Sequence, residues 1–197
     1  MTLARWMAMG AVAVMAVFGT AQAQQPQITP APTFHAGIKV TFPQQIGGAE
    51  QTKTVDYAKT FSRPELGQSW HYSIPGTISA SVYVFTLGET SIPNGAASPA
   101  VHDHFKQAMA EIQQSQKYEK IAVAKGPADC VFGTIAFRCV TENATVVQTK
   151  ENDRLQLLVT GFRNHFVKVR LDWHQGSAVG DAAADRFMQG LVSQVLR

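Results

Sequence analysis

Two histidines that flank an aspartate are the side chains in this chain best placed for chemistry. His102, Asp103 and His104 follow one another in a segment with helical periodicity. Residues two positions apart point in different directions on a helix, so the two imidazoles share a metal ion only if this stretch is extended and the helix begins after it. Asp103 suits the first turn of a helix, where the helix dipole favours a carboxylate. We therefore predict a solvated first helical turn without a metal, and an extended H-x-H metal site is the alternative.

The other histidines do not form a catalytic or metal-binding group that can be recognised in the sequence. They are His35, His71, His165 and His174, which are scattered along the chain without a nucleophile at a characteristic spacing. The sequence also lacks the motifs of serine hydrolases, phosphate-binding loops, zinc proteases and dinucleotide-binding folds. It therefore predicts no catalytic residue, no metal ligand and no cofactor.

A mixed basic and apolar face is expected on the strand near residue 168. The strand's inward-facing apolar residues are Val167, Val169, Leu171 and Trp173. Lys168 and Arg170 alternate with them, as in a strand with one buried and one exposed face, and Phe166 falls on the side of the two cations. Such a face suits a small anionic ligand or the acidic patch of a protein partner. We predict Phe166, Lys168 and Arg170 as ligand-binding residues, and an ordinary solvated face is the alternative.

The pairing of this strand with the preceding one depends on the turn between them. The apolar residues of the preceding strand are Leu155, Leu157 and Val159. A two-residue turn at Arg163 and Asn164 would place the two apolar sets on opposite faces, whereas a three-residue loop that includes Phe162 pairs Val159 with Val167 and unites them. Because a one-residue slip turns every side chain over, we predict the three-residue loop, with Asn164 in the left-handed conformation.

The predicted register also selects the neighbours of the two cations. Gln156, Thr160 and Leu158 would share the face of Lys168 and Arg170. The opposite face alone would then form the hydrophobic core.

The chain's two cysteines are expected to form a disulfide. Gly133 and Thr134 lie between Cys130 and Cys139 and can turn the chain, so the two thiols could meet across a hairpin. An oxidising compartment favours their pairing. Closing so short a loop stabilises by about 2–3 kcal/mol in the chain-entropy model. Two buried free thiols are the alternative.

Turn residues and apolar periodicity divide the remaining sequence into short strands and two helices. The expected strands cover residues 38–42, 52–60, 69–74, 78–87, 121–124, 136–141 and 144–149. Glu142 and Asn143 are expected to form the turn between the last two of these strands. One helix is expected to begin after Ser98, with Pro99 in its first turn, and to run to about residue 117. A second helix is expected at about residues 182–195.

The element order predicts an α+β protein. It consists of an antiparallel β-sheet, made of a meander and an N-terminal hairpin, packed by two main helices. The order resembles the Mog1/PsbP-like sandwich, and the chain is also similar to a family of uncharacterised exported proteobacterial proteins. The segments that carry this resemblance are Leu66-Gly67, Val82-Tyr83-Val84-Phe85, Ile92-Pro93-Asn94-Gly95 and Phe166-Val167-Lys168-Val169-Arg170. The resemblance implies an accessory, non-enzymatic role and brings no catalytic residues.

The N-terminus has the features of a secretory signal peptide. Arg5 precedes an apolar stretch at residues 6–18, and Ala21-Gln22-Ala23 forms a small-x-small cleavage site. We predict cleavage after Ala23 and a periplasmic or secreted mature protein. An uncleaved anchor is the alternative, although the apolar stretch is short for a bilayer span. The predicted organisation is a signal peptide (1–23), a flexible Pro/Gln-rich tail (24–35) and a single α+β domain (36–197).

The charge of the mature chain bears on its partners. The whole chain of 197 residues carries a formal charge of +3, and Arg5 is the single charge of the signal segment, which leaves +2. So small a charge argues against nucleic acid as a partner. We predict a non-catalytic accessory or binding protein for a small anionic ligand or a protein, without stable membrane insertion after cleavage. A small periplasmic hydrolase or metal-dependent enzyme with an unrecognised site is the alternative.

Overall fold

The computed structural model describes residues 31–197, so the predicted signal peptide and most of the predicted tail lie outside the described residues. This described part of the chain contains ten strands: β1 (Thr33–His35), β2 (Val40–Phe42), β3 (Gln45–Ile46), β4 (Ala49–Asp56), β5 (Gln68–Ile74), β6 (Ile78–Phe85), β7 (Tyr118–Phe132), β8 (Ile135–Val146), β9 (Asn152–Phe162) and β10 (His165–His174). The helices are α1 (Tyr57–Phe61), the short 3₁₀ turn η1 (Pro64–Leu66), α2 (Pro99–Gln113) and α3 (Ala178–Gln194). The predicted α+β class is confirmed.

The main sheet has eight strands in the order β3-β4-β5-β6-β10-β9-β8-β7, and all its pairs are antiparallel. Two meanders therefore meet where β6 pairs with β10, and α2 lies in the connection between them. The strands β1 and β2 form a separate two-stranded ribbon. The predicted meander and the N-terminal hairpin β5–β6 are both present.

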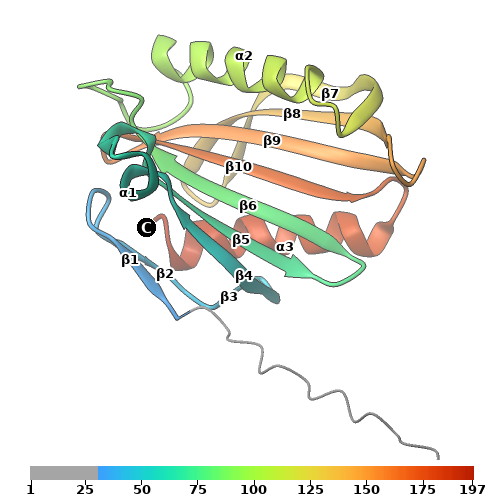
Figure 1. Cartoon of the computed structure of the whole chain (residues 1–197), viewed down its shortest axis with the longest axis horizontal. Coiled ribbons are helices and arrows are strands. Elements are labelled where there is room, and N and C mark those ends of the chain that lie inside the picture. Colours follow the sequence, from blue (N-terminus) through green and yellow to red (C-terminus); the bar gives the residue numbers. More distant parts are fainter. Residues whose placement is uncertain (1–30) are drawn as a thin grey trace, which may run out of the picture.

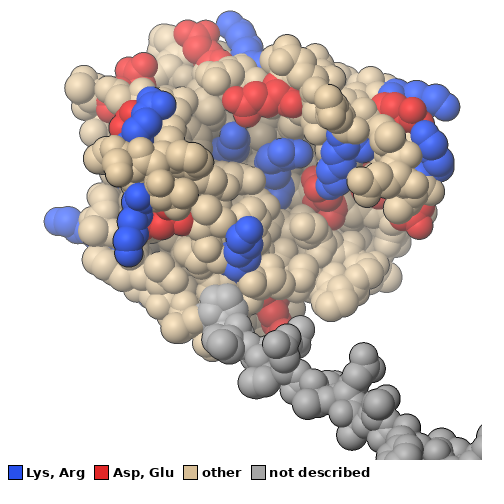
Figure 2. All heavy atoms as spheres, viewed as in Figure 1, with Lys and Arg blue, Asp and Glu red and all other residues tan. Residues whose placement is uncertain are grey.

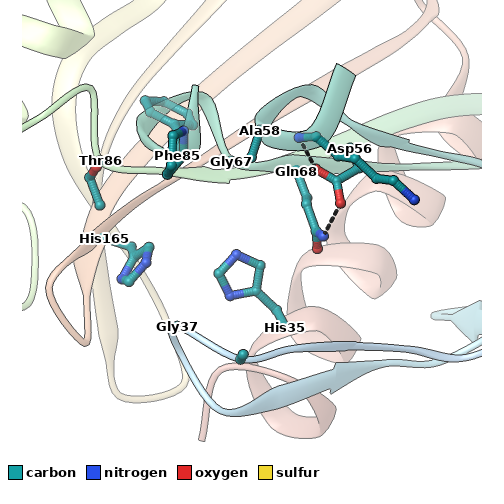
Figure 3. A pocket seen from close by; sticks show the side chains of 12 residues that line it. His35, Gly37, Asp56, Ala58, Gly67, Gln68, Phe85, Thr86 and His165 are labelled. Atoms are coloured by element: carbon teal, nitrogen blue, oxygen red, sulfur yellow. Dashed lines mark hydrogen bonds between the residues drawn. The ribbon is translucent and has the colours of Figure 1, made fainter. Parts of the chain in front are cut away.

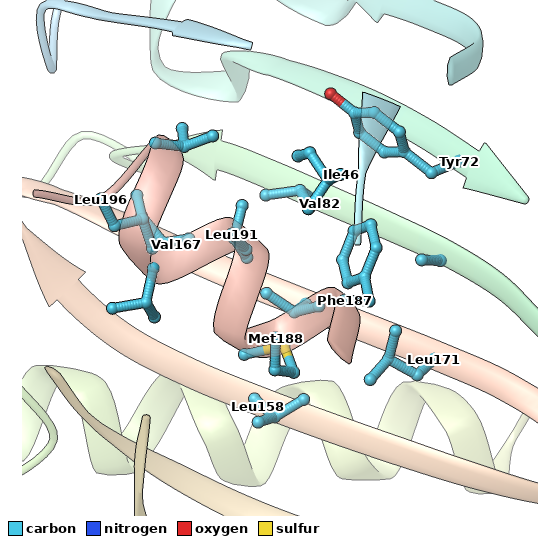
Figure 4. Close-up of a cluster of buried hydrophobic side chains, with 14 of the residues drawn as sticks. Ile46, Tyr72, Val82, Leu158, Val167, Leu171, Phe187, Met188, Leu191 and Leu196 are labelled. Carbon is cyan, nitrogen blue, oxygen red and sulfur yellow. The ribbon is translucent and has the colours of Figure 1, made fainter. Parts of the chain in front are cut away.

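Helices cover both faces of the main sheet, which makes three layers (Figure 1). On one face, α2 packs its apolar stripe on β8, β9 and β10; the core there includes Val101, Phe105, Ala108, Ile112, Leu157 and Phe166. On the other face, α3 and the ribbon cover a larger core (Figure 4) that includes Phe42, Trp70, Val169, Phe187 and Leu191. Each layer is held by apolar burial, and β10 contributes side chains to both cores.

The helix starts follow local sequence signals. The Ser98 hydroxyl accepts a hydrogen bond from the Val101 amide, with Pro99 in the first turn, as predicted. The Ser177 hydroxyl caps α3 in the same way by accepting from the Gly180 amide, so α3 begins earlier than the sequence indicated. Within residues 31–197, no helix has the length and apolar composition that crossing a membrane requires.

The predicted register of β9 and β10 is wrong. The turn contains two residues, Arg163 and Asn164, both at positive φ, and Leu158 pairs with Val169. Asn164 does adopt the left-handed conformation expected for it. The prediction assumed that only one face of the sheet is buried. A helix covers each face, so apolar side chains on opposite faces can both be buried.

This register changes the predicted neighbours of the two cations. Leu155, Leu157 and Val159 lie on the face of Lys168 and Arg170, under α2, whereas Gln156, Leu158 and Thr160 lie on the α3 side. The expected exposed face is therefore largely a second core. Phe166 is 2% exposed within it.

Three further predictions need correction. Residues 135–146 form one strand, β8, with no turn at Glu142 and Asn143, so the meander has longer strands than expected. Residues 33–35, which the sequence placed in the tail, form β1 and pair with β2. The segment after residue 56, predicted as strand, forms α1, capped by the Asp56 carboxylate, which accepts from the Lys59 amide.

The predicted disulfide is confirmed. Cys130 and Cys139 are bonded across the β7–β8 hairpin, with their Cα atoms 6.1 Å apart, and Gly133 and Thr134 make its turn. The bond ties the outermost strand, β7, to its neighbour near the tip of the hairpin.

Candidate functional site

A cavity of about 210 Å³ lies between α2, the strands β6 and β10, and the α1–η1 segment. We call it the Lys168 cavity. It is lined by Tyr57 and Leu66 from the α1–η1 segment, Tyr83 and Phe85 from β6, Leu87, Lys168 from β10, and His104, Gln107 and Glu111 from α2. Positions 104, 107 and 111 are three and four residues apart, so helical geometry places them on one stripe. Figure 2 shows basic side chains in the hollow below α2 and acidic ones near its rim.

Lys168 supplies a positive charge in a largely apolar setting. Its side chain is 14% exposed, and its ammonium group lies 5.0 Å from the centre of the Tyr83 ring and 5.6 Å from that of Phe85. Both contacts are cation–π in character. Burial lowers the pKa of Lys168, and Arg170 lowers it further, whereas Glu111 acts to raise it. The site therefore holds a cation that has lost most of its hydration.

Glu111 is an imperfect partner for this cation. Its carboxylate oxygen lies 3.6 Å from Lys168 Nζ, and its side chain is 53% exposed. A charge-assisted hydrogen bond is shorter, at about 2.7–2.9 Å. Because this contact is long and Glu111 is exposed to solvent, the buried ammonium group is only partly compensated.

His104 is the second polar group of the cavity. It is 6% exposed, and neither of its ring nitrogens has a hydrogen-bond partner among the described residues. Its ring lies 4.9 Å from that of Phe85 and 5.0 Å from that of Phe166. Burial, followed by repulsion from Lys168, lowers the pKa of His104 to about 4, so the imidazole is neutral at pH 7.

The predicted site residues separate in the structure. Lys168 lines the cavity, whereas Phe166 packs behind it against His104 and Phe85. Arg170 lies two residues further along β10, half-buried, opposite Ser81 of β6. Of the three residues predicted together, Lys168 thus lines the cavity, Phe166 packs against residues of its wall, and Arg170 lies outside it.

His104 was expected in a solvated first turn, and the structure contradicts this prediction because the side chain is buried. The sequence does contain a signal for its burial. Position 104 is three residues after Val101 and four before Ala108, both on the apolar stripe of α2. Asp103, by contrast, is exposed as expected and pairs with Lys106 at 3.4 Å.

A second cavity, of about 370 Å³, lies where the ribbon meets β5, β6 and the start of β10 (Figure 3). His35 from β1 and His165 from β10 face each other there with ring centres 5.4 Å apart. Burial, together with His165, lowers the pKa of His35 to about 4. Asp56 also borders the cavity, and it accepts hydrogen bonds from the Lys59 amide and the Gln68 side chain.

The hydrogen bonds of the two histidines constrain what the second cavity can bind. His35 Nδ1 accepts from the Ile38 amide, which leaves the ring proton of the neutral imidazole on Nε2. His35 therefore cannot offer Nε2 to a metal ion without losing this contact. Among residues 31–197, no group of three or more His, Cys, Asp or Glu side chains is arranged to hold a metal ion.

Among the described residues, neither cavity is lined by a serine or a cysteine. The Thr86 hydroxyl on the wall of the second cavity accepts a hydrogen bond from the Gly88 amide. The arrangement at Lys168 can bind and orient an anion. Comparison of the sequence with protein families finds no match, and comparison with characterised proteins finds none either.

Proposed function

We propose that this chain is a non-catalytic accessory protein of the periplasm or the cell exterior, and that the Lys168 cavity binds a small anionic ligand. The observation that carries the proposal is the partly compensated ammonium group of Lys168, buried among aromatic rings and 3.6 Å from an exposed carboxylate. Burying a cation costs free energy unless an anion balances it. A bound anion would supply that balance.

The export of the chain and its relation to known folds belong to the same proposal. The disulfide supports an oxidising compartment, as does the signal-like sequence before Gln24. An antiparallel sheet between helices supports a Mog1/PsbP-like sandwich. That fold would agree with an accessory role rather than a catalytic one.

The enzyme alternative has weaker support. An esterase or similar hydrolase needs a nucleophile within reach of a base. The described residues around His35 and His165 supply imidazoles and a carboxylate, but the carboxylate already caps α1. A binding role needs no such group.

Thermal unfolding in a panel of anions tests the proposal. The panel consists of acetate, benzoate, sulfate and phosphate at matched ionic strength. We expect at least one anion to raise the melting temperature of the mature protein, because a ligand that binds only the folded state stabilises it. The double variant Lys168→Met, Arg170→Met should lose that shift. If no anion raises the melting temperature of the unmodified protein, the small-ligand proposal is wrong, and an acidic patch of a partner protein becomes the occupant to test.

A further inference from the structure

The walls of the Lys168 cavity define the kind of anion it can hold; this inference rests on the proposed binding function. Aromatic and aliphatic side chains form most of the lining, from Tyr57, Leu66, Tyr83, Phe85 and Leu87. The volume of about 210 Å³ corresponds to about seven water molecules at ~30 Å³ each. A small molecule with an apolar body fits such a space better than a hydrated inorganic ion.

The charge of the cavity favours a single negative charge. Among residues 31–197, Lys168 is the one cation on the lining of the cavity, and Glu111 already offsets part of that charge. Phosphate and sulfate are bound in proteins by several donors at once, often by forked guanidinium groups. Arg170, the nearest guanidinium along β10, does not line the cavity. A monoanion is therefore the better match.

His104 adds a hydrogen-bond donor that has no acceptor. A neutral imidazole carries one ring N–H in either tautomer, and both ring nitrogens of His104 are buried without partners among the described residues. The imidazole and the Lys168 ammonium both lie against the Phe85 ring, at 4.9 Å and 5.6 Å from its centre. Both residues also line the cavity, and a carboxylate, with two acceptor oxygens, matches one ammonium and one N–H.

We propose that the Lys168 cavity binds a small monocarboxylate with a flat apolar body, of about the size of benzoate. Its carboxylate pairs with Lys168 and accepts a hydrogen bond from His104. Its body lies among Tyr83, Phe85 and Leu87, where aromatic rings pack well against a flat surface. Glu111, on the exposed rim, competes with the ligand's carboxylate for the ammonium group.

Titration of the disulfide-bonded mature protein with sodium benzoate tests this assignment. Calorimetry measures the affinity, and amide chemical shifts locate the binding site. Benzamide serves as the neutral probe of the same shape, and benzenesulfonate and inorganic phosphate serve as the other anions. We expect benzoate to bind more tightly than all three, with the largest shift changes at β6, the middle of β10 and α2. Benzamide lacks the charge, benzenesulfonate has a bulkier head group, and phosphate lacks the apolar body.

Variants at the cavity separate the charge from the shape. Lys168→Met keeps the apolar stem, so benzoate should bind about tenfold more weakly or worse while benzamide is unaffected. Arg170→Met is the matched control, because it removes a cation from the same strand outside the cavity; benzoate affinity should change by less than about twofold. Glu111→Gln should tighten benzoate binding several-fold by removing the competing carboxylate, and it alters an exposed residue that does not endanger folding.

The outcomes distinguish this inference from the proposed function. If benzenesulfonate or phosphate binds through Lys168 and benzoate does not, the monocarboxylate assignment is overturned while an anion-binding role stands. If Lys168→Met or Glu111→Gln leaves benzoate affinity unchanged, the carboxylate does not meet Lys168, and the assignment is overturned as well. If no probe binds, the assignment falls together with the small-ligand function.

Discussion

At the scale of single residues, His104 combines burial with unmet hydrogen bonding. A buried polar group without a partner costs about 1–3 kcal/mol. The two nitrogens of His104 have no partner among the described residues, and its ring lies against the apolar rings of Phe85 and Phe166. Binding sites often contain residues that lower the stability of the fold, and His104 has this property and lines a cavity.

Replacing this histidine should therefore stabilise the free protein. We expect His104→Phe to raise the free energy of unfolding at pH 7 by about 1–3 kcal/mol, as measured by urea denaturation, because it removes the unpartnered nitrogens. His174→Phe, at an exposed position on the same protein, is the control and should give no such gain. A loss of stability in His104→Phe would show that the imidazole makes favourable contacts in the folded state.

The same variant should change how stability depends on pH. The folded pKa of His104 is about 4, below the ordinary 6.5, so between these values the unfolded chain binds a proton that the folded chain does not. Stability therefore falls as the pH drops from about 6.5 to about 4, by about 3 kcal/mol from this group. His104→Phe lacks this loss, and its advantage over the unmodified protein should grow across that window. An advantage that stays constant with pH would mean that His104 titrates normally.

At the scale of elements, the central strand β10 carries both cores. Val169 faces α3, and Phe166 and Lys168 face α2. The neighbouring strand β9 is arranged the same way, with Leu158 toward α3 and Leu157 toward α2. In a strand covered on both sides, alternation between apolar and polar residues no longer separates the inside from the outside.

Truncations on the two faces should destabilise independently. We expect Val169→Ala to cost about 1–3 kcal/mol and Leu157→Ala about 2–5 kcal/mol in urea denaturation, since each leaves a cavity in a separate core. Val123→Ala, at a position 49% exposed, should change stability by less than about 0.5 kcal/mol.

The double variant Val169→Ala, Leu157→Ala gives the sharper test of the register. In the observed register the two side chains lie on opposite faces, so their costs should add to within about 0.5 kcal/mol. In the register that the sequence predicted, they would be direct neighbours and would couple. Clear non-additivity would therefore contradict the two-residue turn at Arg163 and Asn164.

At the scale of the whole molecule, the strand β7 forms an exposed edge of the main sheet. It pairs with β8 alone in the main sheet, and most of its residues are exposed. Three register shifts interrupt its pairing, and Lys120 and Lys125 lie along it. Bulges and lysines on an edge strand discourage pairing with other chains. The disulfide to Cys139 then holds this strand in place.

Export and the disulfide should therefore be linked. We expect the protein isolated from native cells to begin at Gln24 and to show no titratable thiol after denaturation without reductant. A form that begins at Gln24 and is made in a reducing cytosol is the control. It should show both thiols and be less stable by about 2–3 kcal/mol, in keeping with loss of a short cross-link. Intact Met1 in the membrane fraction of native cells would contradict cleavage.

The sequence by itself determined the features that depend on neighbouring residues. The cap at Ser98, the alternation of β6, the Gly133 turn that brings Cys130 to Cys139, and the left-handed Asn164 are all local, and all are observed. These features arise because hydrogen bonding and backbone sterics act within a few residues. They were enough to predict the α+β class and the antiparallel meander.

Only the tertiary structure decided the register of β9 and β10 and the composition of the Lys168 cavity. Register depends on how many faces of the sheet are covered, and that is a property of the layers rather than of any one strand. The cavity joins Tyr57, Phe85, His104 and Lys168 from elements far apart in the sequence. The sequence identified Lys168 by its alternation, but the burial of His104 and the weak pairing with Glu111 arise from how α2 packs on the sheet.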